Sequence, residues 1–448
     1  MPSAPSHSAS PTSIPGQHHA HGRAHRKQIA RGALAEWSPA LRRRDPLKVL
    51  DEAMRGRIPT LLRLKSERMA VTPFTFFRGA APIMAYDLSL TPHTSIISQI
   101  CGDAHIQNLG AYAGEDGRLT FDINDFDETT LGPFEWDLKR MTTSILLAGR
   151  QGKLRHGSCE SAARAFLREY SAMMTQFTTM PILAMARYKV HGLGRNDSIA
   201  TVFDKAERST PMHSLKKLTK SHDDYRRFRS EPPELRRVVG AERRAVLASL
   251  DHYRKTIAPE RRHLFNQFRA VDVAFKVVGT GSVGLRDYCV LLEGNGNSDP
   301  LFLQIKQEIA SAWAPYFKIS QALSESAMHQ GQRVVNGHRA MQYQSDPMLG
   351  WTSINGEEFV VRQLNDHKAT LDASLLDAAS LRSYAALCGR IFAHGHARSG
   401  DCHMISGYIG KGSVFAEAIL KFAESYAEQT VNDWKLFLKK TRQDDPSQ

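Results

Sequence analysis

The sequence predicts an α+β protein of two lobes, one built mainly from helices and one rich in strands. Residues 275–308 read as three strands separated by a glycine-rich loop and an Asn-Gly turn, and two more strands flank Asn355 and Gly356. Most of the remaining chain has the apolar spacing of helices. With 448 residues, 42% of them hydrophobic, the chain is long enough to bury a substantial core.

Four segments are expected along the chain. Residues 1–30 are rich in Pro, Ser, His and Ala, a composition that predicts a disordered tail. Residues 31–270 are expected to form a helical large lobe that also carries a short hairpin. A β-rich small lobe is expected over residues 271–366, and residues 367–448 are expected to return to the large lobe as helices.

Bulk composition restricts the class of protein. No apolar run reaches the roughly 18 residues of a membrane span, and no signal-peptide core is visible, so we expect a cytoplasmic protein. The five cysteines are scattered without metal-like spacing, which is typical of thiols in a reducing compartment.

The net charge of +13 indicates an anionic partner, such as phosphates, nucleic acid or a membrane surface. Residues 205–262 hold 16 basic and 8 acidic residues. Their aromatic residues are too sparse to form a stacking platform for bases, so we favour a solvated surface over nucleic-acid binding.

A tight polar run follows an expected strand near residue 100. The run ICGDAHIQNLG contains Asp103, His105 and Asn108, and Asp125 and Asp127 return in FDINDFDE a few residues later. The intervening Glu-Asp-Gly sequence is a hairpin turn signal. We therefore expect the hairpin to fold the two acidic segments against each other.

The glycine-rich loop of the small lobe is a candidate phosphate-binding element. Gly279, Gly281 and Gly284 fit G-x-G-x-x-G, but they lie between two strands, whereas the dinucleotide fingerprint requires a strand followed by a helix. The next strand ends near Lys306. This order is typical of a glycine flap over nucleotide phosphates, with a lysine on the third strand.

The polar run has the spacing of a kinase catalytic loop. Asp103 and Asn108 are five residues apart, like the catalytic Asp and the metal-binding Asn, and Asp125-Phe126-Asp127 stands where D-F-G would stand. Phosphoryl transfer needs Mg²⁺ held by hard oxygen ligands and a carboxylate that orients the attacking hydroxyl. Asn108 and Asp125, with Asp127 beside them, are thus candidate metal ligands, and Asp103 is the candidate base.

At these residues the chain resembles the protein-kinase-like superfamily, in the style of the aminoglycoside and choline phosphotransferase branch. GDAHIQN is similar to that branch's G-D-x-H-x-x-N, and DFDETTLGPFEWDL resembles its metal-binding stretch. The resemblance implies that Asp137 opens the next helix and braces the catalytic loop. We expect His105 to hold the loop instead of performing chemistry. Most of residues 60–405 also resemble a bacterial uncharacterised family, domain of unknown function 2252, through PFTFFRGAA, GDAHIQNLG, FEWDLKR, GQRVV and FVVRQL.

The order of these motifs departs from ordinary kinases, because the glycines and Lys306 follow Asp103 instead of preceding it. Either the likeness is accidental or the fold is a circularly permuted kinase-like fold, and we favour permutation. Under this interpretation Gln363 and Leu364 belong to the hinge that binds adenine, and Glu325 is the helix partner of Lys306, with Glu308 as the other candidate.

The sequence therefore predicts an ATP- and Mg²⁺-dependent phosphotransferase that acts on a hydroxyl of a small molecule or a protein. Two alternatives remain, a catalytically inactive kinase-like binding scaffold and a nucleotidyl transferase. Each motif also has a plain structural interpretation, as a polar turn, an Asx turn, a simple hairpin or an edge-strand lysine. Any one of these plain interpretations is common, but all of them holding at once is much less so, and we therefore favour the functional hypothesis.

Overall fold

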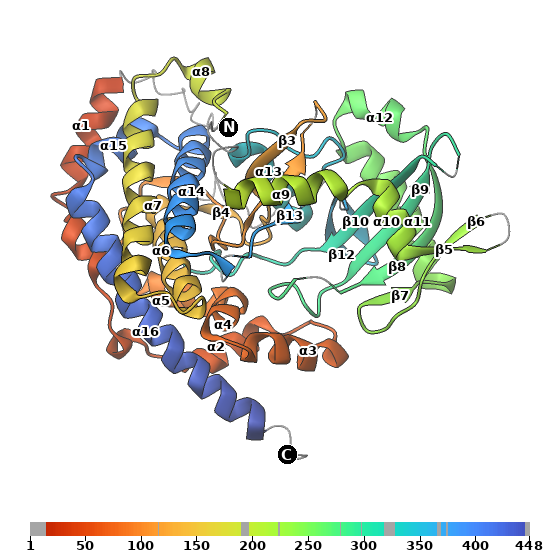
Figure 1. The fold of residues 1–448 in the computed structure, drawn as a ribbon, viewed down its shortest axis with the longest axis horizontal. Coiled ribbons are helices and arrows are strands. Elements are labelled where there is room, and N and C mark those ends of the chain that lie inside the picture. Colours follow the sequence, from red (N-terminus) through yellow and green to blue (C-terminus); the bar gives the residue numbers. More distant parts are fainter. Residues whose placement is uncertain are drawn as a thin grey trace, which may run out of the picture.

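The computed structural model describes residues 15–114, 116–189, 197–222, 225–277, 279–296, 298–317, 328–364, 369–372 and 375–443. It is a mixed α+β structure, mostly helical, with several antiparallel sheets. Figure 1 shows helices gathered on one side, the helical part, and a large sheet with its own helices on the other, the sheet part.

The sheet part is organised around an antiparallel sheet in the order β11-β12-β10-β9-β8-β7. Its strands are β7 (Leu235–Arg237), β8 (Arg269–Lys276), β9 (Asp287–Glu293), β10 (Pro300–Gln307), β11 (Gly350–Ile354) and β12 (Glu357–Gln363). The turn between β11 and β12 is local, because Asn355 and Gly356 both adopt positive φ, the conformation of a tight two-residue hairpin.

Helices cover both faces of this sheet, which explains why β9 and β10 are buried along their whole length. Alternate residues of β9 point to opposite faces. Val290 packs with Val246 of α11 (Gly240–Thr256), whereas Leu291 packs with Leu215 of α10 (Pro211–Leu218). Also in this part are α12 (Pro259–Phe265), α13 (Gln330–Met341) and the hairpin of β5 (Thr219–His222) and β6 (Tyr225–Phe228).

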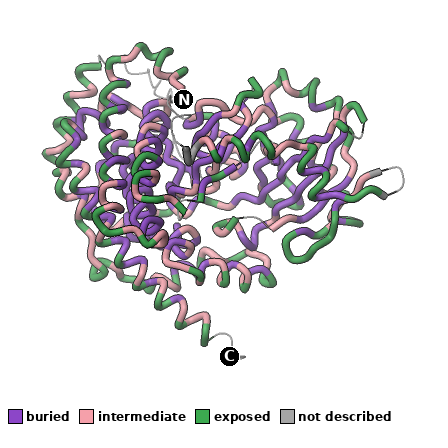
Figure 2. The backbone as a smooth tube through the Cα atoms, in the orientation of Figure 1, coloured by how far each residue is buried: buried purple, intermediate pink, exposed green. Residues whose placement is uncertain are grey.

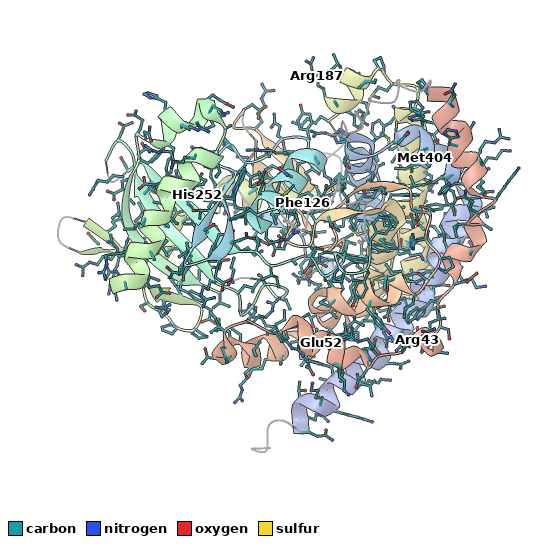
Figure 3. All side chains as sticks on the ribbon, turned by 180° about the vertical axis from the view of Figure 1, so that it is seen from behind. Arg43, Glu52, Phe126, Arg187, His252 and Met404 are labelled. Carbon is teal, nitrogen blue, oxygen red and sulfur yellow. The ribbon has the colours of Figure 1, made fainter. Side chains whose placement is uncertain are left out.

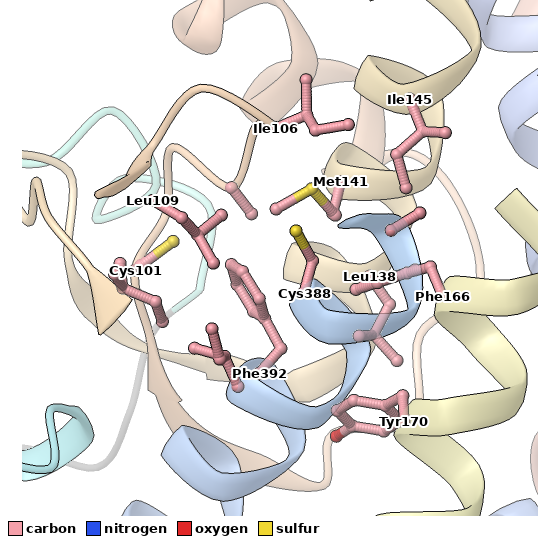
Figure 4. Close-up of a cluster of buried hydrophobic side chains, with 14 of the residues drawn as sticks. Cys101, Ile106, Leu109, Leu138, Met141, Ile145, Phe166, Tyr170, Cys388 and Phe392 are labelled. Carbon is pink, nitrogen blue, oxygen red and sulfur yellow. The ribbon is translucent and has the colours of Figure 1, made fainter. Parts of the chain in front are cut away.

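The helical part encloses α6 (Phe134–Gln151), which is buried on all sides by α7 (His156–Phe177), α14 (Ala378–Ser399) and α16 (Ser413–Gln443). Figure 2 shows this concentration of buried residues. In Figure 4, Leu138 and Met141 of α6 lie among side chains from α7 and α14, with Ile106 above them and Leu109 to one side. The core of the helical part therefore reaches the segment that carries Asp103.

The remaining elements complete the helical part. Its short strands are β1 (Ile97–Ile100), β2 (Leu109–Ala113), β3 (Leu119–Ile123), β4 (Thr130–Pro133) and β13 (Ala369–Thr370). They pair as β1-β4 and β13-β2-β3. Its other helices are α1 (Pro15–His25), η1 (Arg31–Ala35), η2 (Pro39–Leu41), α2 (Pro46–Ala53), α3 (Pro59–Ala70), α4 (Pro73–Gly79), α5 (Ala81–Ser89), α8 (Ile182–Ala186), α9 (Asp197–Arg208) and α15 (Cys402–Ile409).

The N-terminal segment differs from the disordered tail expected over residues 1–30. Residues 15–25 form α1, which lies against α15, and residues 1–14 fall outside the described residues. Two glycines allow this close approach, because a Cβ at Gly22 would lie 2.0 Å from the carbonyl oxygen of Met404 and one at Gly407 would lie 2.2 Å from that of His19. Packing between helices distant in sequence overrides the polar composition.

The sheet part includes residues that precede the boundary expected at residue 271. The sheet part begins near α10, because Leu215 and Tyr253 belong to hydrophobic clusters of the sheet and β7 pairs with β8. The segment 205–262, expected to be helical, contains β5, β6 and β7. Its basic residues lie on solvated faces of short strands and helices. The spacing of such exposed charges does not distinguish a strand from a helix.

Within the described ranges, no helix combines the length and the apolar character that crossing a bilayer requires.

A candidate active site between the glycine loop and the Asp103 loop

The first turn of α6 binds the loop that follows β1. The N–H groups of Cys101 and Gly102 donate to the two carboxylate oxygens of Asp137, at 2.8 and 3.0 Å. Asp137 lies 3.3 Å from Nε2 of buried His396, whose Nδ1 is 2.9 Å from the hydroxyl of Tyr170. A polar chain from α7 and α14 thus fixes the start of the loop.

Asp103 is oriented by a buried arginine. Arg140, one turn after Asp137 on α6, donates from Nε and Nη2 to one carboxylate oxygen, at 2.9 and 2.5 Å. The other oxygen is 3.6 Å from Nε2 of His105. Burial alone would raise the pKa of Asp103, but Arg140 and His105 outweigh it and hold this pKa below its usual value. Asp103 is therefore ionised, with one oxygen turned away from Arg140.

Asn108 joins the two acidic segments. Its Nδ2 donates to the carbonyl oxygens of Asp103 and Asp125, at 3.0 and 2.9 Å, and its Oδ1 accepts from the N–H of Asp125 at 2.8 Å. The hairpin of β2 and β3 brings these segments together, since Leu109 pairs with Ile123. The hairpin turn signal in the sequence therefore has the expected spatial result.

Lys306 reaches these carboxylates from the sheet part. Its Nζ is 3.5 Å from Asp125 and forms a close ion pair with Asp127. Between them Phe126 is buried against the ring of His338 on α13, near the junction of the two parts in Figure 3. Segments about 180 residues apart meet here, since Asp127 and Lys306 are separated by 179 positions.

The charges in this cluster are strongly coupled. Burial and the neighbouring Asp125 raise the pKa of Asp127 to about 7. Burial opposes ionisation of Asp125 too, but Lys306 and Arg362 hold its pKa well below the usual value. Burial and Asp127 raise the pKa of Glu308 well above its usual value. Three carboxyl groups therefore share the charge of Lys306, and two of them, Asp127 and Glu308, are harder to ionise than usual.

The glycine loop closes the cleft from the opposite side. A cavity of about 90 Å³ is lined by Gly279, Gly281, Asp103, Asp125 and Asp127, among others. The loop leads from β8 directly into β9 without a helix, as the sequence predicts.

Three cationic side chains, from α3 and from the residues just before it, donate hydrogen bonds to the carbonyl oxygens of this loop. Arg57 donates to Gly281 and Val283, Lys65 to Thr280 and Gly281, and Arg68 to Gly279. Burial, followed by the charge of Arg57, lowers the pKa of Lys65 well below its usual value.

The oxygen atoms of the cleft fit a hard divalent cation. Within the described part of the chain, Asp125 Oδ1 and Glu308 Oε1 are buried without a hydrogen-bond partner. The described set of three ligand atoms within 4.8 Å of one another lies elsewhere, at His156, Glu160 and Glu424. Mg²⁺ usually takes one or two carboxylates and completes its shell with phosphates and water, so Asp125 and Asp127 suit it.

Two sequence-predicted residues, Gln363 and Leu364, do not line this cleft. Glu325 falls outside the described residues, and the described helix α13 contains no Glu. The N–H of Gln363 donates to the carboxylate of Asp346, and that of Leu364 donates to the carbonyl oxygen of Phe302. Those two groups are thus engaged within the protein in this structure, instead of facing a nucleotide.

Several residues in or near the cleft were not predicted from the sequence. Arg333 of α13 donates to the carbonyl oxygens of Asp127 and Thr129, so this helix grips the acidic loop with an arginine. Arg140 follows Asp137 at helical spacing in FEWDLKR, a signal that could have been read. Arg57 and Lys65 had no signal, because they are more than 200 positions from the loop they hold.

Neither a curated protein nor a solved structure matches this chain. A bacterial family described as "Uncharacterized protein conserved in bacteria (DUF2252)" matches residues 57–440, a range that includes every described cleft residue named above. The chain belongs to this family.

Proposed function

We propose that the protein is an ATP- and Mg²⁺-dependent phosphotransferase with a circularly permuted kinase-like fold, acting on a hydroxyl-bearing acceptor. The observation that carries the proposal is the convergence of Lys306 with Asp125 and Asp127 beside the glycine loop and Asp103. A simple hairpin, an Asx turn and an edge-strand lysine have no reason to meet in one cleft.

The order of elements supports the kinase-like interpretation. In protein kinases a glycine-rich loop covers the phosphates and the phosphate-binding lysine lies on the third strand. Here the glycine loop joins β8 to β9, Lys306 lies on the following strand β10, and α13, β11 and β12 complete the sheet part. The long helix α14 then returns under the catalytic loop, where Tyr384 donates to the carbonyl oxygen of Ile106 at 2.9 Å.

The residues can be assigned roles in phosphoryl transfer. The free oxygen of Asp103 would accept a hydrogen bond from the acceptor hydroxyl and aim it at the γ-phosphate. Because the pKa of Asp103 is lowered, it orients the hydroxyl and is a weak base. Lys306 and the glycine loop would bind the phosphates of ATP. Asn108, Asp125 and Asp127 would hold Mg²⁺, which neutralises charge on the transferred group when bound.

ADP release from ATP by the purified protein tests the proposal. Asp103→Asn and Lys306→Met are expected to lower turnover at least a hundredfold, while Lys220→Ala, an exposed lysine on β5, leaves it unchanged. Circular dichroism must show that each variant is folded. Undiminished turnover in folded Asp103→Asn and Lys306→Met would overturn the proposal.

A catalytically inactive scaffold is the second candidate. The close pairing of Lys306 with Asp127, which stands where kinases have the D-F-G glycine, favours it. ATP-dependent stabilisation without ADP, AMP transfer or phosphate transfer would support this candidate. Transfer of AMP with release of pyrophosphate would instead identify nucleotidyl transfer through the same cleft.

A further inference from the structure

We propose that Arg78, supported by Arg57, forms a binding site for an anionic group of the acceptor, so that the substrate is a hydroxyl compound carrying a phosphate or a carboxylate. This inference rests on the proposed phosphotransferase function and names its substrate class.

Arg78 is a cleft cation with donors to spare. It lies at the end of α4, lines the cleft together with Asp103, and donates from Nη1 to the side chain of Gln107 at 2.8 Å. Its Nε is buried and has no hydrogen-bond partner in the described part of the chain. Burial lowers the pKa of Arg78, and the carboxylates of Asp103, Asp125 and Asp372 offset this effect only in part.

Arg57 adds a second guanidinium to the same wall. It lines the cleft, and its Nη1 donates to the carbonyl oxygens of Gly281 and Val283 at 3.0 and 2.7 Å. Across the described ranges neither Arg57 nor Arg78 forms a direct ion pair, and the carboxylates of Asp103 and Asp125 act on Arg78 only at longer range. An anionic ligand would supply a direct counter-charge to both guanidinium groups.

The position of Arg78 assigns this anion to the acceptor and not to ATP. The phosphates of the nucleotide are served by Lys306 and the glycine loop, and Asp103 is already neutralised by Arg140. Arg78 is tied to Gln107, which lies inside the loop between Asp103 and Asn108. A molecule whose hydroxyl meets Asp103 would therefore bring its neighbouring group to Arg78. Guanidinium groups bind phosphate and carboxylate through paired hydrogen bonds, which explains an arginine at this position.

Calorimetric titration of the full-length protein with inorganic phosphate, and separately with acetate, tests the inference. We expect saturable binding of at least one anion, weakened tenfold or more by Arg78→Gln and partly restored by Arg78→Lys. Arg57→Gln is the second variant, in case Arg78→Gln fails to fold. Arg63→Gln is the matched control, because Arg63 is an exposed arginine on α3 that pairs with Glu67.

A second titration, in the presence of Mg²⁺ and a saturating non-hydrolysable ATP analogue, separates the two phosphate sources. Retained binding of the anion supports an acceptor site, whereas competitive displacement would assign Arg78 to the nucleotide and overturn the inference. Absent binding, or equal binding by Arg78→Gln, would also overturn it. If the anion binds at Arg78 but the ATP analogue does not bind, the proposed function fails while the anion site stands.

Discussion

At the scale of single residues, Asn108 links the two acidic segments of the candidate site. It makes three hydrogen bonds with the backbone of Asp103 and Asp125, from a buried position. Asn108→Ala would leave three partly buried backbone groups without this partner, and we expect it to lower the free energy of unfolding by about 2–4 kcal/mol in urea denaturation. Asn266→Ala, at an exposed position, is the control and should change it by less than about 0.5 kcal/mol. Equal losses of stability in the two variants would mean that the hydrogen bonds of Asn108 do not stabilise the fold.

Asp127 makes Mg²⁺ binding depend on pH. Because its pKa is raised to about 7, the carboxylate is mostly protonated at pH 6 and mostly ionised at pH 8. A protonated carboxylate does not bind a metal, so Mg²⁺ affinity should rise with pH, roughly tenfold between these values. Calorimetric titration with MgCl₂ at both pH values measures it. Asp127→Asn should remove the pH dependence, and an affinity that does not change with pH in the wild type would contradict the assignment.

At the scale of elements, α3 controls the glycine loop. Lys65 is buried and donates to two loop carbonyls, so Lys65→Met removes two hydrogen bonds worth roughly 0.5–1.5 kcal/mol each. We expect amide hydrogen exchange over residues 279–284 to accelerate at least tenfold in the absence of nucleotide. Arg63→Gln, on the exposed face of the same helix, should leave this exchange unchanged. Unaltered exchange in Lys65→Met would show that the loop is held by other contacts.

Elements with local causes were predictable from sequence, and elements made by distant contacts were not. The Asn355-Gly356 turn specifies its own hairpin, and the glycine loop is recognisable in the sequence because it lies between two β-prone runs. By contrast, β7 exists because it pairs with β8 across more than 30 residues, and α1 because glycines let it approach α15. In the candidate site, the motif carboxylates and Lys306 were identifiable from spacing, whereas Arg333 and the α3 cations depend on tertiary contact alone.

At the scale of the whole molecule, the C-terminal helix secures the N-terminal helices. Phe437 of α16 packs in a hydrophobic cluster with Met69 of α3 and Phe76 of α4. Phe437→Ala would leave a cavity and should lower the free energy of unfolding by about 3–5 kcal/mol. The neighbouring Leu436 is 47% exposed, so Leu436→Ala should have little effect. Similar losses in the two variants, measured by urea denaturation, would indicate that α16 does not secure this cluster.

The order in which the hydrophobic cores are built along the chain has a consequence for biosynthesis. The clusters of the sheet part draw, apart from Leu61, on residues between 215 and 364, whereas that of the helical part combines residues from Leu34 to Ala427. As the polypeptide leaves the ribosome, the middle of the chain can close its core first, while α6 and α7 await α14 and α16. Chaperones should therefore bind mainly to the early helices, because the apolar faces of these helices stay uncovered until translation is almost complete.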